Sequence, residues 1–120
     1  MTPSLEDYLK IIGLLAGRGK VRITDIALQR RVAKPSAVIA IKALEAQGLL
    51  KHERYRDVIL TEQGTEKAAE ISGRYEFLLW FLRDVLGVSQ KTAEQDSCKM
   101  EHIVSEETLR QMKNVKAYQT

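Results

Sequence analysis

Three side chains of the kind that bind transition metals lie close together in the last quarter of the sequence: Cys98, Glu101 and His102. Their spacing of three and four residues places them on one face of a helix, where they can converge on one ion. A thiolate, a carboxylate and an imidazole are suitable ligands for iron, cobalt, nickel or zinc. The alternative interpretation is structural, because a lone cysteine on an amphipathic helix is usually a small buried apolar residue. The pattern favours a metal site over a purely structural helix.

The same residues give little support for catalysis. The chain has two histidines, no glycine-rich phosphate loop and no His-Glu-x-x-His motif. Cys98 and His102 could form a thiol and base pair, but two neighbours on one helix lack the third group that usually orients such a base. We therefore expect no enzymatic activity and no small organic substrate.

Charge is distributed unevenly along the 120 residues, whose net charge is +3. Residues 1–60 carry 11 Lys and Arg against 6 Asp and Glu, and residues 61–120 carry 8 against 10. A basic first half is typical of a domain that binds a polyanion such as DNA. The single cysteine excludes an internal disulfide, and no apolar run is long enough to span a bilayer. The N-terminus does not resemble a signal peptide, so we expect a cytoplasmic protein without membrane contact.

The elements that must position these residues begin with three helices. A first helix is expected from an N-cap at Ser4 to the glycines at 17 and 19, followed by a short extended segment at 21–23. Thr24 is expected to cap a second helix over 25–31. Pro35 suits the first turn of a third helix that ends at Ala46, with Gly48 as its C-cap.

Two short β-strands and a helical second half follow. Residues 49–53 and 58–61 have the composition of strands around a basic hairpin tip. Gly64 is expected to break the chain, and the pattern from Thr65 onward is helical with interruptions at Gly73, 87–89 and Ser105. The predicted fold is mainly α with a small β-hairpin wing: a winged helix-turn-helix over 1–64, followed by a helical dimerisation and metal-binding domain over 65–120.

The winged helix-turn-helix predicts a specific set of DNA contacts. The third helix would enter the major groove, and the hairpin tip would reach the sugar–phosphate backbone or the minor groove. The helix carries few polar groups, so apolar contacts to thymine methyl groups are expected. Alternatively, Ile39 packs internally and specificity comes from DNA shape. The predicted DNA-binding residues are Lys34, Pro35, Ser36, Ala37, Ile39, Ala40, Lys42, Arg54, Tyr55 and Arg56. A winged helix that binds another protein is a further alternative, which the two arginines of the tip disfavour.

A helix that is apolar on nearly every side begins near residue 75. Such a helix must be buried on several sides, and a chain of this size can achieve that by packing against a second copy. A purely intramolecular core helix is the alternative. The predicted dimer-interface residues are Tyr75, Phe77, Leu78, Trp80, Phe81, Leu82 and Val85.

Several segments together resemble the diphtheria-toxin-repressor family of metal-dependent repressors, most closely its short, manganese-regulator type. These segments are residues 3–9, 24–27, 35–38, 55–64, 74–76, 81–82, 86–88 and 98–105. The resemblance implies a homodimer that binds operator DNA of metal-ion homeostasis genes when a divalent transition metal is bound. It also implies a fourth ligand on the first helix, which falls on Asp7. One ion that joins Asp7 to the other three ligands would fix the angle between the two domains.

The sequence departs from the family pattern at three positions. Tyr75, Leu79 and Lys10 stand where the family often has a histidine, a glutamate and a further acid. A second metal position is therefore not expected, and Glu94 is the one obvious spare carboxylate. We expect one ion per subunit, with Fe²⁺ preferred and Mn²⁺, Co²⁺, Ni²⁺ or Zn²⁺ as alternatives, since thiolate is softer than manganese prefers. A regulator that has lost its metal site, or that senses oxidation through Cys98, stays open as the second interpretation.

Overall fold

The computed structural model of the chain describes residues 1–52 and 57–117, with no side-chain description for residues 116 and 117. The chain divides into two compact units, Met1–Ile71 and Ser72–Thr120. The helix α4, Glu62–Trp80, contains the boundary between them. The predicted domain division after residue 64 stays a prediction.

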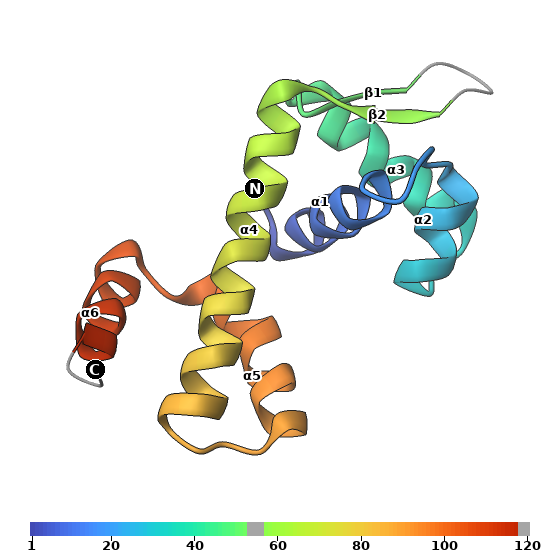
Figure 1. Cartoon of the computed structure of the whole chain (residues 1–120). Helices are drawn as coiled ribbons and strands as arrows, with labels where there is room; N and C mark the ends of the chain where they lie inside the picture. The colour runs from blue at the N-terminus through green and yellow to red at the C-terminus, as the bar shows by residue number, and fades with distance from the viewer. Residues whose placement is uncertain (53–56, 118–120) are drawn as a thin grey trace. The chain divides into compact units, whose positions relative to one another are not determined.

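The described part of the first unit contains three helices, a hairpin and the first half of α4 (Figure 1). The helices are α1 (Pro3–Ala16), α2 (Ile23–Arg30) and α3 (Lys34–Ala46), and the strands are β1 (Leu50–His52) and β2 (Val58–Leu60). Their buried side chains form one apolar core, in which Leu9, Ile12, Ile26, Ile41, Leu44 and Leu50 are almost fully inaccessible to solvent. This order of elements confirms the predicted winged helix-turn-helix.

Two of the predicted N-caps are wrong. Helix α1 starts at Pro3 because Thr2 is its cap, and the Thr2 hydroxyl accepts a hydrogen bond from the Leu5 N–H at 3.2 Å. Proline is favoured in a first helical turn, where its missing N–H costs nothing. Helix α2 starts at Ile23, one residue before the predicted cap, because the Asp25 carboxylate accepts from the backbone N–H of Arg22 at 3.1 Å.

The hairpin is antiparallel and shorter than predicted, with Leu50 paired to Leu60 and His52 to Val58. It is tied to the rest of the first unit at two points. The Val58 N–H donates to the carbonyl of Val21, which lies between α1 and α2, at 2.8 Å, and the His52 N–H donates to Glu45 of α3 at 2.9 Å. These bonds hold the wing against α3 and against the segment that joins α1 to α2.

The predicted chain breaks at Gly64 and Gly73 are wrong, since both residues lie inside α4. Gly64 is needed for close packing: a Cβ there would overlap the Leu49 carbonyl group. Thr61 caps the helix, because its hydroxyl accepts from the Gly64 N–H at 3.1 Å and donates to the Gly48 carbonyl at 2.7 Å. Thr61, directly after β2, thus joins the start of α4 to the turn that follows α3.

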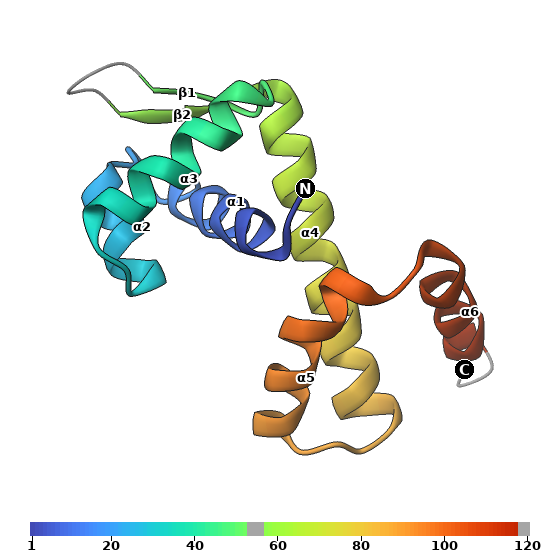
Figure 2. The ribbon, with the colours of Figure 1, turned by 180° about the vertical axis from the view of Figure 1, so that it is seen from behind.

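The described secondary structure of the second unit is helical, with short breaks at residues 86–89 and 104–105. After α4 come the π-helix η1 (Phe81–Val85), α5 (Gln90–Ile103) and α6 (Glu106–Ala117). Helix α5 turns back beside the last turns of α4 (Figure 2). The predicted interruptions after residue 86 and at Ser105 are confirmed: Gly87 has a φ of 77°, and the Ser89 hydroxyl caps α5. In the part of the chain that the structure describes, no helix is both long and apolar enough to cross a membrane.

Candidate functional site

Helix α5 carries the three predicted ligands Cys98, Glu101 and His102. Ser89 caps this helix, which begins at Gln90. The inward face of the helix consists of Ala93, Ser97 and Glu101, which are four residues apart. Glu101 is 1% exposed, which is unusual for a carboxylate, while Cys98 is exposed. The helix thus presents one carboxylate to the interior and one thiol to the surface.

The geometry at the C-terminal end of α5 suits a metal ion. His102 Nε2 lies 3.3 Å from Glu101 Oε1, and both side chains are nearly inaccessible to solvent. Two ligand atoms that each lie about 2.0–2.2 Å from one ion, at octahedral or tetrahedral angles, are separated by roughly 3.0–3.5 Å. The nitrogen and oxygen therefore already have the spacing of two ligands of one ion. Cys98, one turn earlier on the same helix, is a third donor of suitable chemistry.

Asp7 belongs to the first unit, in the second turn of α1. Its Oδ2 lies 3.7 Å from Nη2 of Arg30, which is the last residue of α2. The guanidinium carbon of Arg30 also lies 5.3 Å from the ring centroid of Tyr8. That Asp7 binds the same ion as the three residues of α5 stays a prediction.

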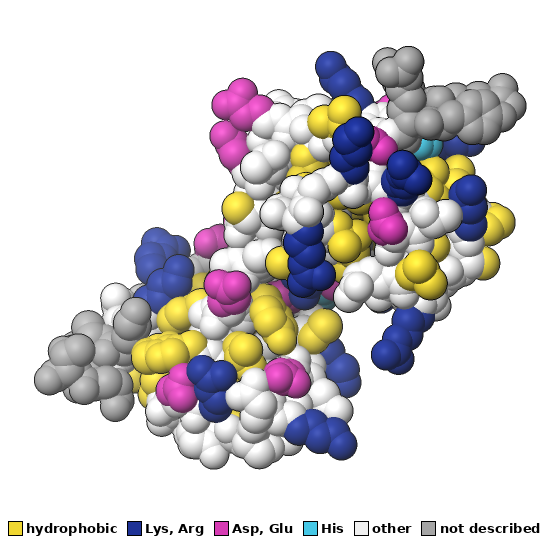
Figure 3. Space-filling view, turned by 45° about the vertical axis from the view of Figure 1, so that its right-hand side comes forward, with side chains coloured by type: hydrophobic (Ala, Val, Ile, Leu, Met, Phe, Trp, Pro, Cys, Tyr) yellow, Lys and Arg dark blue, Asp and Glu magenta, His cyan; other side chains and the backbone are white. Residues whose placement is uncertain are grey.

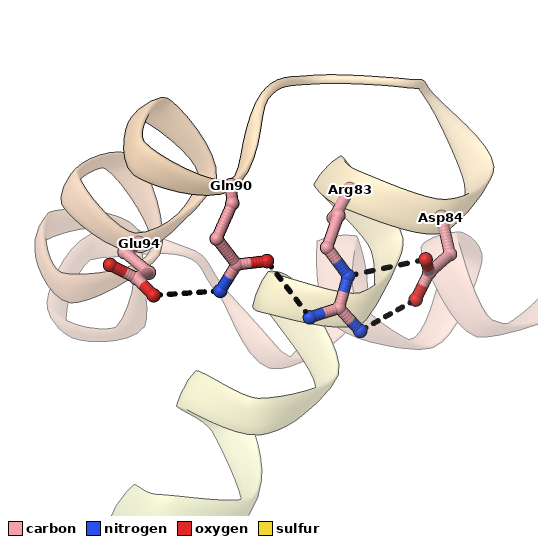
Figure 4. A network of polar contacts seen from close by, with 4 residues as sticks. All are labelled: Arg83, Asp84, Gln90 and Glu94. Carbon is pink, nitrogen blue, oxygen red and sulfur yellow. Dashed lines mark hydrogen bonds and ion pairs between the residues drawn. The ribbon is translucent and has the colours of Figure 1, made fainter.

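Glu94, the predicted spare carboxylate, is part of a polar network (Figure 4). The Gln90 amide donates to Glu94 at 2.7 Å and accepts from Arg83 Nη1 at 3.1 Å. Arg83 in turn makes two hydrogen bonds to Asp84, the shorter of 2.8 Å, and these lower the pKa of Asp84. The contact between Arg83 and Gln90 joins η1 to the start of α5, and Glu94 contacts Gln90 on the same helix. The spacing of four between Gln90 and Glu94 was the sequence signal for this contact.

Two of the α3 residues that were predicted to contact DNA are buried. Ala37 and Ala40 are 0% and 6% exposed, so their predicted contacts with DNA are wrong. Both lie on the face of α3 that packs into the core with Ile41 and Leu44. Ile39 is 70% exposed, which excludes the alternative that it packs internally.

The remaining predicted contacts on α3 lie at the surface. Lys34, Pro35, Ser36 and Lys42 are all exposed. Lysine and arginine side chains are spread among exposed apolar ones over the face of the first unit that Figure 3 shows. The predicted wing residues Arg54, Tyr55 and Arg56 lie outside the described residues. Arg22 is a basic residue that the prediction missed, and it forms a 3.9 Å ion pair with Asp57 at the base of the wing.

The predicted dimer residues fall into two groups. Leu78, Phe81 and Leu82 are buried within one subunit and contribute to its intramolecular packing, and their part in a dimer interface stays a prediction. Tyr75, Phe77, Trp80 and Val85 are half-buried and keep apolar surface available for a partner.

Contacts within the second unit account for part of this burial. The ring of Phe77 lies about 6 Å from the rings of Trp80 and Phe81 and receives Lys113 Nζ at 5.3 Å from its centroid. Arg74 donates to the Val104 carbonyl at 2.6 Å. The intramolecular alternative therefore describes part of α4 and η1, and the predicted dimer interface stays a prediction.

Comparison with known proteins identifies both halves of the chain. Residues 1–58 match the family model of the iron dependent repressor, N-terminal DNA binding domain. Residues 61–118 match that of the iron dependent repressor, metal binding and dimerisation domain.

Individual relatives agree with the family models. An uncharacterized HTH-type transcriptional regulator of Methanocaldococcus jannaschii is 36% identical over 116 residues, which are 94% of this chain and 92% of that protein. The transcriptional regulator MntR of Escherichia coli is 38% identical over 106 residues, 88% of this chain and 68% of its own length. The solved structure of the manganese regulator SloR is 27% identical, with a TM-score of 0.82 over 98% of this chain, which spans 55% of that structure. The chain therefore belongs to the iron-dependent repressor family, also called the diphtheria-toxin-repressor family, and is a metal-dependent transcriptional regulator that binds DNA as a homodimer.

Proposed function

We propose that this regulator binds one divalent transition-metal ion per subunit through Asp7, Cys98, Glu101 and His102, and that metal occupancy controls its affinity for operator DNA. The observation that supports this proposal best is the contact between Glu101 and His102. A carboxylate with 1% exposure lies 3.3 Å from an imidazole nitrogen, and the same helix carries the Cys98 thiol one turn earlier. Buried charges in proteins are paired or bind metal ions, and a divalent ion would supply two positive charges to this donor set.

The donor set also bears on the choice of metal. SloR is described as a manganese regulator, whereas the family models are named for iron. Cys98 offers a thiolate, which Fe²⁺ and Co²⁺ accept more readily than Mn²⁺ does. We therefore propose Fe²⁺ as the preferred ion of this chain, with Mn²⁺ as the main competitor.

The proposed mechanism couples the two units through their ligands. Asp7 lies on α1, whose buried residues share one apolar core with those of α3. The other three proposed ligands lie on α5. Ligands from both units on one ion would fix the orientation of each α3 within the dimer. The two α3 helices must reach successive major grooves, roughly 34–36 Å apart, so a fixed orientation favours the DNA-bound state. Operator DNA would in turn tighten metal binding by the same factor.

On DNA, the exposed face of α3 would occupy the major groove. Lys34 and Lys42 can neutralise phosphates, Ser36 can form hydrogen bonds, and Ile39 can contact thymine methyl groups. We propose repression of metal-ion homeostasis genes in the cytoplasm, without a catalytic activity.

Fluorescence anisotropy on duplex DNA from the protein's own promoter region tests the proposal. Fe²⁺, Mn²⁺, Co²⁺ and Zn²⁺ are titrated in turn, each against a chelator control, with wild-type protein, Cys98→Ala and Asp7→Ala. We expect a metal-dependent rise in affinity that both substitutions reduce. Tight DNA binding that ignores metal and chelator would instead favour a metal-independent regulator. Sensitivity to oxidant alone, lost in Cys98→Ala, would favour thiol sensing.

A further inference from the structure

Arg30, the last residue of α2, contacts Asp7, one of the proposed metal ligands. Its Nη2 lies 3.7 Å from Asp7 Oδ2, and its guanidinium lies over the ring of Tyr8, the next residue of α1. The Arg30 side chain is 33% exposed and that of Asp7 is 22% exposed, so the pair is partly shielded from solvent. Arg30 Nε is buried and has no hydrogen-bond partner among the described residues. The cation is thus held by a carboxylate and an aromatic face.

We infer that Arg30 is a built-in counter-ion of Asp7, which competes with the metal ion for this carboxylate and so raises the metal concentration at which the regulator responds. This inference rests on the proposed metal site. An arginine is always charged at physiological pH, so its competition does not depend on protonation. A divalent ion on Asp7 would lie close to a positive guanidinium, and like charges at such separations repel strongly when partly shielded from water.

Because of its position in the chain, Arg30 can couple the competition for Asp7 to the DNA-binding helix α3. Arg30 is the last residue of α2, and Arg31 follows it in the left-handed conformation with a φ of 60°. Three residues later α3 begins at Lys34, the first predicted DNA contact. When Asp7 exchanges Arg30 for a metal ion, the end of α2 loses its ionic contact with α1. The turn that leads into α3 therefore responds to the state of Asp7.

The test compares metal affinities of full-length variants. Arg30→Gln removes the charge and keeps a long polar side chain, Arg30→Lys keeps the charge, and Arg31→Gln removes a charge from the neighbouring exposed position. Free Mn²⁺ is counted by electron paramagnetic resonance during a titration without DNA, and Co²⁺ is titrated by calorimetry.

We expect Arg30→Gln to bind both ions about tenfold more tightly than wild type, since a partly shielded ion pair and a like-charge repulsion are both removed. Arg30→Lys should stay within about threefold of wild type, because Lys retains the competing charge, and Arg31→Gln within about twofold, because the Asp7 contact is intact. The melting temperature should also respond: the deficit of Arg30→Gln relative to wild type should be larger without metal than at saturating metal.

Each of the following outcomes would overturn the inference. Equal metal affinity in wild type and Arg30→Gln would show that Arg30 does not compete. Weaker metal binding in Arg30→Gln would show that Arg30 orients Asp7 for the ion instead. Unchanged metal affinity together with weaker DNA binding at saturating metal would make Arg30 a phosphate contact. If wild-type protein binds neither Mn²⁺ nor Co²⁺, the proposed metal site itself is wrong and the inference falls with it.

Discussion

Replacement of Glu101 by glutamine tests the buried carboxylate at the centre of the proposed metal site. Glutamine has the same shape as glutamate, so it fits the space of a side chain that is 1% exposed. It removes the negative charge and replaces one carboxylate oxygen by a nitrogen donor that carries hydrogens. A buried position also keeps water from replacing the lost ligand. Glu101→Gln should therefore lose most of its metal affinity while it keeps its fold.

The expected magnitude follows from the linkage between metal binding and stability. An ion at a concentration 100 times its Kd stabilises the folded protein by about 2.7 kcal/mol. Substitutions that only affect the partners of metal ligands already cost 10–100-fold in affinity, so loss of a charged ligand should cost at least about 100-fold. At the same metal concentration the variant would then gain roughly 0.4 kcal/mol. For a chain of this size, the metal-induced rise in Tm would be about 10 °C in wild type and about 2 °C in the variant.

Differential scanning fluorimetry with Co²⁺ measures both shifts. The comparison uses the metal-induced change within each protein, so any effect of the substitution on the metal-free state cancels. Asp96→Asn is the matched control, because it removes a charge from an exposed position on the same helix and should keep the full wild-type shift. An equal metal-induced shift in wild type and Glu101→Gln would refute the role of Glu101 as a ligand.

Further predictions concern stability, DNA contacts and pH. Gly64→Ala should destabilise the fold by about 3 kcal/mol or more in urea denaturation because its Cβ has no space, whereas Gly73→Ala, in an open helical position, should stabilise it by about 0.5–1 kcal/mol. Ile39→Ala should change stability by less than about 0.5 kcal/mol and weaken operator binding about fivefold, with little effect on random duplex DNA in the same anisotropy assay. The pKa of Asp84 should lie below its ordinary 3.8 in an NMR titration and return toward it in Arg83→Gln. Because the folded-state pKa is lowered, this contact stabilises the protein above about pH 4 and is lost as the pH falls through the folded-state value.

Local signals predicted the order and type of the elements well. Pro35 and Ala46 marked α3 closely, and the composition of residues 49–53 and 58–61 predicted the hairpin, because both signals depend on neighbouring residues. The errors arose where distant residues decide the outcome. Gly64 resembles a helix breaker in the sequence, yet it lies inside α4 because the backbone at Leu49 approaches so closely.

The candidate site shows the same limit. The spacing of Cys98, Glu101 and His102 predicted a shared helix face, but sequence periodicity could not show that Glu101 points inward and is buried. The spacing on α3 likewise could not tell that Ala37 and Ala40 belong to the core, because alanine suits both a buried and an exposed helix face. Pairs such as Arg30 with Asp7 are 23 positions apart and depend on how α2 packs against α1.

A cobalt titration followed by two signals tests the central claim most directly. Absorption of the thiolate–cobalt complex counts ions bound by the Cys98 sulfur, and anisotropy of labelled operator DNA follows affinity in the same sample. The account predicts that absorption saturates at one ion per subunit, that DNA affinity rises over the same range, and that Cys98→Ser loses the absorption. DNA affinity that is equal in cobalt and in chelator, or a rise in affinity without any thiolate–cobalt absorption, would contradict it.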